Sequence, residues 1–242
     1  MEDRVRISVI TPTYNRAGPL LAECIESFIA QDYKDCEQII VNDGGIDSTD
    51  DFVKPYLARD KRIKYYHKGA NGGEASAVNY ALTKTDADLC CTLYDDDLLT
   101  PKSLSARAAI FDANPVLEFI YTSVENIEMN GKVMLYWKAT DYPANALKVW
   151  TNQYIHMSGV MWKRSIIDKI GNYNEDLWHY CDWDFLIRCL MECQCMPFDV
   201  LTFKTRYHPE QKSVIRRNLK RDGPENRKMR DSLNARYKGI FK

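Results

Sequence analysis

Apolar runs and helical patterns alternate along the first part of the chain. The runs at 6–15, 37–43 and 87–94 are rich in apolar and β-branched residues, and polar residues end or follow each of them, which is typical of buried strands. Between them, segments such as 18–32 and 73–84 space their apolar residues three or four positions apart, which indicates amphipathic helices. Because strands and helices alternate, the pattern predicts an α/β fold with parallel strands covered by helices.

The rhythm of the pattern changes after Pro101. Residues 101–114 have a helical pattern, and 117–137 have two strand patterns joined at Asn130-Gly131, a dipeptide that favours tight hairpin turns. A turn-rich stretch follows and leads into an apolar-periodic helix. No low-complexity linker separates these parts, so the sequence predicts one continuous domain. We place this domain at 1–211, its halves at about 1–98 and 99–211, and a C-terminal extension at 212–242.

Polar turns follow three of the predicted strands. They contain the residues Thr13–Asn15, Asn42–Gly45 and Asp95–Asp97. Because the carboxyl ends of parallel strands meet at one edge of a sheet, we expect these turns to converge on one crevice. The sequence therefore predicts a ligand site at this edge.

Composition indicates a globular protein without a membrane span. Of the 242 residues, 45% are apolar, and no apolar run approaches the roughly 20 residues that a spanning helix needs. The first ten residues lack the pattern of a signal peptide, so we expect a cytoplasmic protein. The eight cysteines follow neither a disulfide pattern nor a zinc pattern, which indicates reduced thiols.

The charge is unevenly distributed along the chain. Residues 212–242 carry a net charge of +8, whereas the first 211 residues carry −9. We favour a solvated, partly helical basic segment, and the alternative is a surface for anionic lipid, a polyanionic acceptor or a partner protein. Nucleic acid is not expected as a partner, because no aromatic residues are interleaved with the basic ones in a stacking pattern.

Three consecutive carboxylates, Asp95, Asp96 and Asp97, directly follow an apolar run. Two carboxylates about 4 Å apart repel by roughly 4 kcal/mol at an effective dielectric constant near 20. Such a triplet needs solvent or a cation to offset this repulsion. The two interpretations are therefore a solvated acidic loop and a metal site.

Five segments, taken together, resemble a known family. They are ISVITPTYNR, IIVNDGGIDSTD, NGGEASAVNYAL, YDDDLLTP and EDLWHYCDWDFLIRC. In this order and spacing they resemble the inverting nucleotide-sugar glycosyltransferases of family 2, and the match runs from about Arg6 to about Ser213. The resemblance implies the A-type glycosyltransferase fold. This fold has a Rossmann-like, mostly parallel sheet flanked by helices, a nucleotide-sugar-binding half, and an acceptor-binding half with a smaller sheet.

The resemblance assigns the acidic triplet to a metal in a DXD-like motif. The metal-binding aspartate of the family resembles Asp96, Asp95 is placed to reach the ribose or metal-bound water, and Asp97 is a weaker metal candidate. Tyr94 stands where the first aspartate of the motif often lies, so the division of roles within the triplet stays open. A departing diphosphate needs a divalent cation, and hard oxygen ligands suit Mn²⁺ or Mg²⁺.

Further residues resemble the donor site of the family. Asp43 resembles the aspartate that reads the base, since a carboxylate can accept a hydrogen bond from the imide N–H of uracil or thymine. An ordinary turn aspartate is the alternative for Asp43. The remaining candidate residues for the donor nucleotide are Thr11, Pro12, Tyr14, Asn15, Asn71, Gly72 and Gly73. The glycines allow close approach of the backbone and open a helix whose N-terminus favours phosphate.

His208 and Asp182 complete the predicted site. His208 resembles a family histidine that closes over the donor and reaches the metal or diphosphate, and the alternative is a loop histidine. Asp182 resembles the general base that takes the proton of the acceptor hydroxyl. The alternative for Asp182 is a helix cap, and Asp184 points away from Asp182 if both lie on one helix.

The sequence therefore predicts a metal-dependent enzyme that moves a sugar from a nucleoside diphosphate to an acceptor hydroxyl with inversion. UDP is the expected nucleotide, a glycan or other hydroxyl compound is the expected acceptor, and the expected role is polysaccharide or glycoconjugate biosynthesis. For the basic extension, a peripheral contact with the cytoplasmic membrane face is the alternative to the favoured solvated segment. Two alternatives remain at this stage: a sugar nucleotidyltransferase, although no Gly-rich basic loop follows the first strand, and a binding module without turnover.

Overall fold

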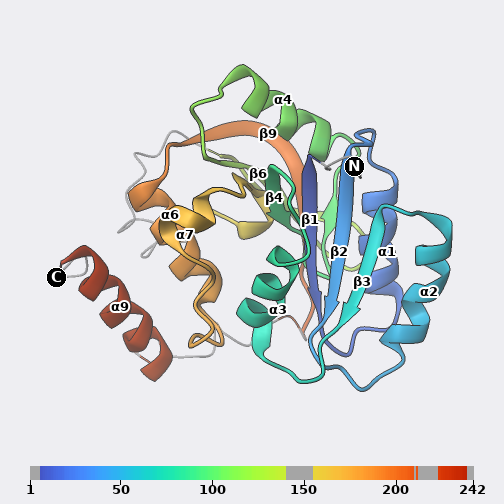
Figure 1. The fold of residues 1–242 in the computed structure, drawn as a ribbon. Coiled ribbons are helices and arrows are strands. Elements are labelled where there is room, and N and C mark those ends of the chain that lie inside the picture. Colours follow the sequence, from blue (N-terminus) through green and yellow to red (C-terminus); the bar gives the residue numbers. More distant parts are fainter. Residues whose placement is uncertain (1–5, 140–154, 210, 212–222, 239–242) are drawn as a thin grey trace.

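A computed structural model describes residues 6–139, 155–209, 211 and 223–238 (Figure 1). Strands and helices alternate in its first half, as the sequence predicts. These elements are β1 (Ile7–Thr13), α1 (Pro19–Ile29), β2 (Cys36–Asn42), α2 (Thr49–Arg59), β3 (Ile63–His67), α3 (Gly73–Leu82) and β4 (Leu89–Thr92). The later elements are β5 (Leu98–Leu99), α4 (Ser103–Ala113), β6 (Phe119–Ile127), β7 (Val133–Trp137), a 3₁₀ turn (Met157–Gly159), β8 (Val160–Lys163), α6 (Ile166–Ile170), α7 (Cys181–Glu192), β9 (Cys195–Arg206) and α9 (Pro224–Tyr237).

The described strands form one sheet in the order β3-β2-β1-β4-β8-β6-β9-β5, with β7 paired to β6. Strands β1 to β4 are parallel, whereas β8 joins β4 and β6 in antiparallel fashion. The α/β fold predicted from the sequence is confirmed. The strands of the second half continue the first sheet through β8, so the smaller sheet expected in the second half is an extension of the first.

Burial explains why the central strands read as continuous apolar runs. Every residue of β2 is buried, and β1 is buried at all positions but one, because helices cover both faces of the parallel part of the sheet. Helix α1 begins with Pro19 in its first turn and buries Leu21, Cys24, Ile25 and Phe28, which lie on one stripe. The predicted hairpin is also confirmed, with Gly131 at a φ of +84° in the turn between β6 and β7.

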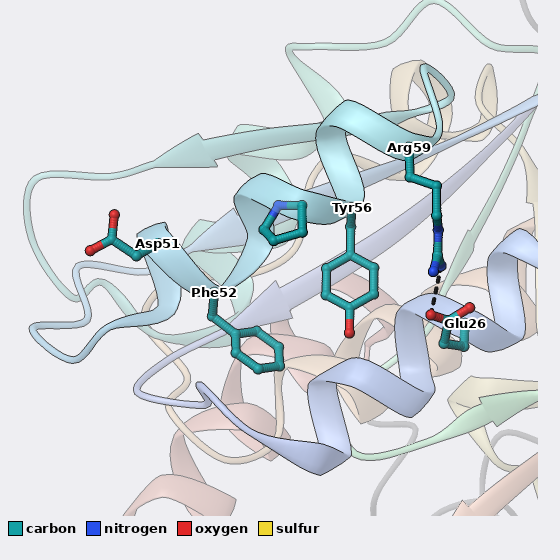
Figure 2. A pocket seen from close by; sticks show the side chains of 6 residues that line it. Glu26, Asp51, Phe52, Tyr56 and Arg59 are labelled. Carbon is teal, nitrogen blue, oxygen red and sulfur yellow. Dashed lines mark hydrogen bonds and ion pairs between the residues drawn. The ribbon is translucent and has the colours of Figure 1, made fainter.

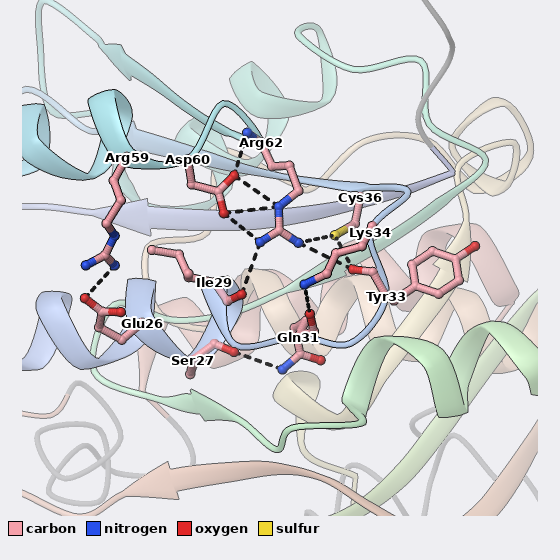
Figure 3. Close-up of polar contacts among 10 residues, drawn as sticks. All are labelled: Glu26, Ser27, Ile29, Gln31, Tyr33, Lys34, Cys36, Arg59, Asp60 and Arg62. Carbon is pink, nitrogen blue, oxygen red and sulfur yellow. Dashed lines mark hydrogen bonds and ion pairs between the residues drawn. The ribbon is translucent and has the colours of Figure 1, made fainter.

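Arg62 joins two loops at the amino-terminal edge of the parallel strands (Figure 3). Its guanidinium donates to Asp60 Oδ2 at 2.6 Å and to the Ile29 carbonyl at 3.1 Å, and it lies 5.0 Å from the centre of the Phe28 ring. These contacts tie the end of α1 to the entry of β3. They stabilise the sheet at the edge opposite the carboxyl ends of the strands.

The described part of the C-terminal extension is the helix α9. It is packed on one side, since Met229 and Leu233 are 0% and 1% exposed. The remaining residues of the extension, including Arg216 and Arg217, lie outside the described residues. No helix in the described ranges has the length and apolar content needed to cross a membrane.

The cysteines behave as the sequence predicts. All eight are free thiols, and only Cys195 is more than slightly exposed. Burial raises the pKa of the Cys36 thiol to about 11.

Candidate active site

The polar ends of β1, β2 and β4 meet at one edge of the sheet. The Thr13 hydroxyl donates to Asp95 Oδ2 at 2.7 Å, and Arg16 Nε lies 3.5 Å from Asp95 Oδ1. The side-chain oxygen of Asn15 accepts the backbone N–H of Ile46 at 2.8 Å, just after β2. The convergence predicted from the three turns is therefore confirmed.

The three carboxylates of the acidic triplet have different partners. All three residues are buried, and their relative exposures are 9%, 8% and 2% for Asp95, Asp96 and Asp97. Asp95 is held by Thr13, whereas Asp96 Oδ2 lies 2.9 Å from His208 Nε2. The triplet is therefore not a solvated loop.

Asp97 turns towards β9. Its Oδ1 accepts the backbone N–H of Arg206 at 2.9 Å, and its Oδ2 accepts the Ser158 hydroxyl at 3.3 Å. Burial, together with the negative charge of Asp96, raises the pKa of Asp97 well above its usual range. Because both of its oxygens accept hydrogen bonds, Asp97 anchors the acidic turn to β9.

Asp96 and His208 together could hold a divalent cation. Asp96 Oδ2 and His208 Nε2 lie 2.9 Å apart, and both residues are buried. A carboxylate oxygen and an imidazole nitrogen are suitable ligands for Mn²⁺. The residues in the described ranges offer no group of three or more His, Cys, Asp or Glu side chains arranged for a metal. This pair therefore fits a cation that takes its other ligands from phosphate and water, as Mg²⁺ and Mn²⁺ do at nucleotides.

Asp43 connects the end of β2 to the start of α3. It is 4% exposed, and its carboxylate accepts hydrogen bonds from Lys68 Nζ and the Gly73 N–H, both at 2.7 Å. The Gly72 N–H also points at Asp43, 3.2 Å from each carboxylate oxygen. The sequence predicts that the backbone N–H groups of Gly72 and Gly73, at the start of α3, face phosphate. In the structure they donate to Asp43 instead.

Two glycines allow close packing of the backbone around Asp43 and the start of α3. Gly44 has a φ of +75°, and a Cβ there would lie 2.5 Å from the carbonyl carbon of Ala70. Gly73 has a φ of +83°, and the ring of Trp178 covers its Cα. A side chain at position 44 would push the turn after β2 away from the turn before α3, and one at position 73 would push Trp178 away from α3.

The other predicted donor residues occupy contrasting positions. Thr11 is fully buried and its hydroxyl accepts from Gln38 Nε2 at 3.0 Å, so only its main chain could face a ligand. Pro12 follows it in β1, and Tyr14 is 46% exposed just beyond the strand. Asn71 accepts the Gly73 N–H at 3.0 Å through its side-chain oxygen and thereby shapes the turn before α3.

Asp182 and Asp184 have different surroundings in the first turn of α7. Tyr180 occupies the N-cap position of this helix without a side-chain capping hydrogen bond, and Asp182 Oδ1 accepts the N–H of Trp183 at 2.9 Å. Asp184 is 2% exposed and pairs with Arg188 at 2.8 Å. Desolvation raises the pKa of Asp184, and Arg188 opposes that shift. Asp184 is thus committed to a buried ion pair.

Asp182 affects the electrostatics of Tyr94, the residue before the acidic triplet. The Tyr94 hydroxyl donates to Glu74 Oε1 at 2.7 Å. Burial raises the pKa of Tyr94 well above its usual range, and the charges of Glu74 and Asp182 raise it further. Asp182 therefore lies within electrostatic range of the Tyr94 hydroxyl, beside Glu74.

Sequence reasoning missed four charged residues of this edge: Arg16, Lys68, Glu74 and Arg206. Arg206 is 4% exposed and forms an ion pair with Glu23, while its Nε and Nη1 have no hydrogen-bond partner. Arg16 and Glu74 lie within the motifs ISVITPTYNR and NGGEASAVNYAL, and Arg206 lies two residues before His208, which are the signals in the sequence. The partners of Lys68 and Arg16 come from other loops.

A separate hollow lies between α1 and α2 (Figure 2). It has a volume of about 410 Å³. Its lining residues are Glu26, Asp51, Phe52, Pro55, Tyr56 and Arg59. The ion pair between Arg59 and Glu26, at 2.6 Å, crosses its side. None of the predicted site residues lines this hollow, so it is distinct from the candidate active site.

Comparison with known sequences identifies relatives along most of the chain. The sequence model described as "Glycosyl transferase family 2" matches residues 8–171. An uncharacterized glycosyltransferase of Methanocaldococcus jannaschii is 30% identical over 192 residues, which are 78% of this chain and 66% of that protein. One from Rickettsia felis is 29% identical over 213 residues, which are 86% of this chain and 35% of that protein. The chain thus spans about two thirds or less of the length of these relatives.

Solved structures share the fold at low sequence identity. Staphylococcus aureus TarS 1–349 in complex with UDP-GlcNAc has a TM-score of 0.71 and 19% identity, covering 86% of this chain and 60% of that chain. The mannosyltransferase PcManGT from Pyrobaculum calidifontis, in complex with GDP-Man and Mn²⁺, has a TM-score of 0.65 and 19% identity, covering 89% and 61%. These likenesses support the A-type glycosyltransferase fold.

Proposed function

Since the chain belongs to glycosyl transferase family 2, we propose that it transfers a sugar from a UDP-sugar to an acceptor hydroxyl with inversion at the anomeric carbon. The observation that carries the proposal is the buried pairing of Asp96 Oδ2 with His208 Nε2 at 2.9 Å. This pair lies at the sheet edge where Asp95 and Asp43 also end their strands. Structural neighbours with UDP-GlcNAc and with GDP-Man and Mn²⁺ support a nucleotide-sugar donor.

Asp96 and His208 are the proposed ligands of Mn²⁺ or Mg²⁺. When bound, the cation would offset the negative charge of the leaving diphosphate. Asp95 would contact the ribose, and Thr13 and Arg16 hold its carboxylate in place. For Asp97, the hydrogen bonds with Arg206 and Ser158 favour an anchoring role over that of a metal ligand.

Asp43 is the proposed acceptor for the imide N–H of uracil. A carboxylate offers about four acceptor positions, and Lys68, Gly72 and Gly73 leave room for one more donor. The exposed ring of Tyr14 could cover the base, with the main chain of Thr11, Pro12 and Asn15 beside it. Arg206 is a further candidate for the diphosphate, because two of its buried donors are unpaired.

Asp182 is the proposed general base. An inverting transfer needs a carboxylate on the acceptor side that takes the hydroxyl proton as the new glycosidic bond forms and the bond to the diphosphate breaks. Asp182 is less buried than Asp184, whose carboxylate is held in the ion pair with Arg188. This difference favours Asp182 over its neighbour.

The proposed role is polysaccharide or glycoconjugate biosynthesis in the cytoplasm, with peripheral contact at the membrane face through the basic extension. Lys228 and Arg236 of α9 already pair with Asp176 and Glu192, so the free basic charge of this helix is smaller than the sequence suggests. Flotation with vesicles of anionic and of neutral lipid, at low and high salt, tests the membrane contact. Absence of binding to anionic vesicles at low salt would remove it.

Turnover tests the proposed function. Purified protein is incubated with Mn²⁺ and, in turn, UDP-GlcNAc, UDP-glucose and GDP-mannose, and release of the nucleoside diphosphate is measured with and without a panel of hydroxyl acceptors. We expect UDP release that Asp96→Ala abolishes. Binding of UDP-sugars without any release, across the acceptor panel, would favour the binding-module alternative.

A further inference from the structure

Helix α9 contacts both ends of the segment that runs from α6 into α7. Glu225 Oε1 accepts the backbone N–H of His179 at 2.7 Å, and Lys228 Nζ donates to the Asp176 carbonyl at 3.1 Å. At its other end, Arg236 Nη1 donates to the Ile170 carbonyl at 2.9 Å. Arg236 also pairs with Glu192 at 2.6 Å. Helix α9 therefore contacts the end of α6, the turn before α7 and the end of α7.

Apolar burial supports the same packing. Met229 and Leu233, which lie four residues apart on one face of α9, are 0% and 1% exposed. Asn226 on the same face is 3% exposed. A helix that buries this face is part of the folded domain, although its composition reads as a basic tail.

The opposite side of the same segment is held by α3. Asn79 Nδ2 donates to the Tyr173 carbonyl at 2.9 Å, and Asn79 Oδ1 accepts the Tyr173 N–H at 2.9 Å. The ring of Trp178 packs over Gly73, the first residue of α3. Residues 173–179 are thus held between α3, which carries the Asp43 contact, and α9. Asp182 follows three residues after His179.

We propose that α9 fixes the turn that leads into α7, and that Glu225 is the positioning residue through which it orients Asp182. This inference rests on the proposed function, in which Asp182 is the general base. A hydrogen bond from a main-chain N–H to a carboxylate is charge-assisted and directional, so it restrains the chain more than the exposed pair of Lys228 and Asp176.

Glu225 also lies in the first turn of α9, where a negative charge stabilises the helix itself. The substitution Glu225→Gln separates the two effects. The amide oxygen can still accept the N–H of His179, whereas the favourable charge at the helix start is lost. Glu225→Ala removes both, and Asp231→Ala is a matched control, because Asp231 is exposed on the same helix.

Hydrogen exchange on the full chain is the direct measurement. We expect the amides of residues 174–182 to exchange roughly tenfold or more faster in Glu225→Ala, and to change little in Glu225→Gln and Asp231→Ala. Unchanged exchange in Glu225→Ala, or equal acceleration in Glu225→Gln, would overturn the proposal.

UDP release from UDP-GlcNAc with Mn²⁺ is the functional measurement. Glu225→Ala should lower kcat severalfold while the KM for the donor and the affinity for UDP stay near wild type, because Glu225 does not touch the donor side. Faster exchange without a loss of kcat would also overturn the proposal. If the wild-type protein neither binds UDP nor releases it, the proposed function itself is wrong, and the exchange result separates that case from a failure of Glu225 alone.

Discussion

Asp95, Asp96 and Asp97 are adjacent in sequence, yet each carboxylate meets a different partner. Thr13 holds the first, His208 faces the second, and the backbone of Arg206 and the hydroxyl of Ser158 hold the third. Hydrogen bonds thus stabilise the carboxylates of Asp95 and Asp97 without the need for a cation. Asp96 is left with an imidazole, which is itself a metal ligand.

We therefore expect Asp96→Ala to weaken Mn²⁺-dependent binding of UDP by about tenfold or more. Loss of a residue that holds a metal ligand in place lowers metal affinity by a similar factor. The apo protein should unfold at the same temperature or higher, because the substitution removes a charge that repels Asp97. Calorimetric titration of UDP with and without Mn²⁺ measures the effect, and Asp112→Ala, an exposed carboxylate, is the control. Equal affinity of the wild type with and without Mn²⁺ would argue for a metal-free site.

Asp182 and Asp184 allow a contrast within one helical turn. Asp182→Asn should keep the unfolding temperature and UDP affinity, but lower sugar transfer by roughly 100-fold or more, since it removes proton transfer. Asp184→Asn should instead destabilise the fold by about 3 kcal/mol, because it leaves Arg188 charged and buried. Transfer assays and urea unfolding on both variants decide the assignment, and wild-type transfer by Asp182→Asn would exclude it as the base.

At the scale of single residues, the sequence offers candidates where they stand in a short motif. The acidic triplet, Asp43, Asp182 and His208 stand within motifs that strand ends and the family resemblance mark. Their partners could not be predicted in this way. Lys68 reaches Asp43 from the end of β3, and Ser158 reaches Asp97 across 61 positions in the chain, distances that only the tertiary fold closes.

At the scale of elements, alternation of strand and helix predicted the parallel half well, because each strand there is buried on both faces. The antiparallel addition of β8 left no comparable signal, since four residues are too few to establish a period. The packing of α9 was also hidden, because only two buried apolar side chains distinguish it from a solvated basic helix.

The loop between α2 and β3 gives a prediction for pH. Hydrogen bonds from Arg62 hold the pKa of Asp60 below its ordinary value. Because the folded pKa is the lower one, this carboxylate contributes stability above about pH 4 and loses it as the pH falls through the folded value. Asp60→Asn should therefore cost roughly 1 kcal/mol near pH 7 and progressively less below about pH 4.

Urea unfolding of wild type and Asp60→Asn across this pH range measures the difference. UDP affinity should not change, since Arg62 lies at the amino ends of the parallel strands and the candidate site at their carboxyl ends. A cost that stays constant down to pH 3 would show that the charge of Asp60 is not what Arg62 stabilises.

At the scale of the whole molecule, one sheet carries residues from both halves to one site. Strand β9 runs parallel to β6 and antiparallel to β5, which directly follows the acidic triplet. This pairing brings Arg206 and His208 beside Asp96 and Asp97 from more than 100 positions away. Residues of both halves therefore sit on one continuous sheet, and ligand binding at the site should stabilise the entire domain.

Binding of UDP and Mn²⁺ is thus expected to raise the unfolding temperature of the whole chain in a single transition. A ligand at 100 times its dissociation constant stabilises the native state by about 2.7 kcal/mol, which corresponds to about 5–10 °C for a domain of this size. EDTA or Asp96→Ala should abolish most of the shift, because the proposed cation ligands Asp96 and His208 come from the two halves of the sheet. Differential scanning calorimetry with UDP, Mn²⁺ and both together provides the measurement. An equal shift with UDP in the presence of EDTA would mean that the nucleotide binds without the cation, and two separate transitions would mean that the halves unfold independently.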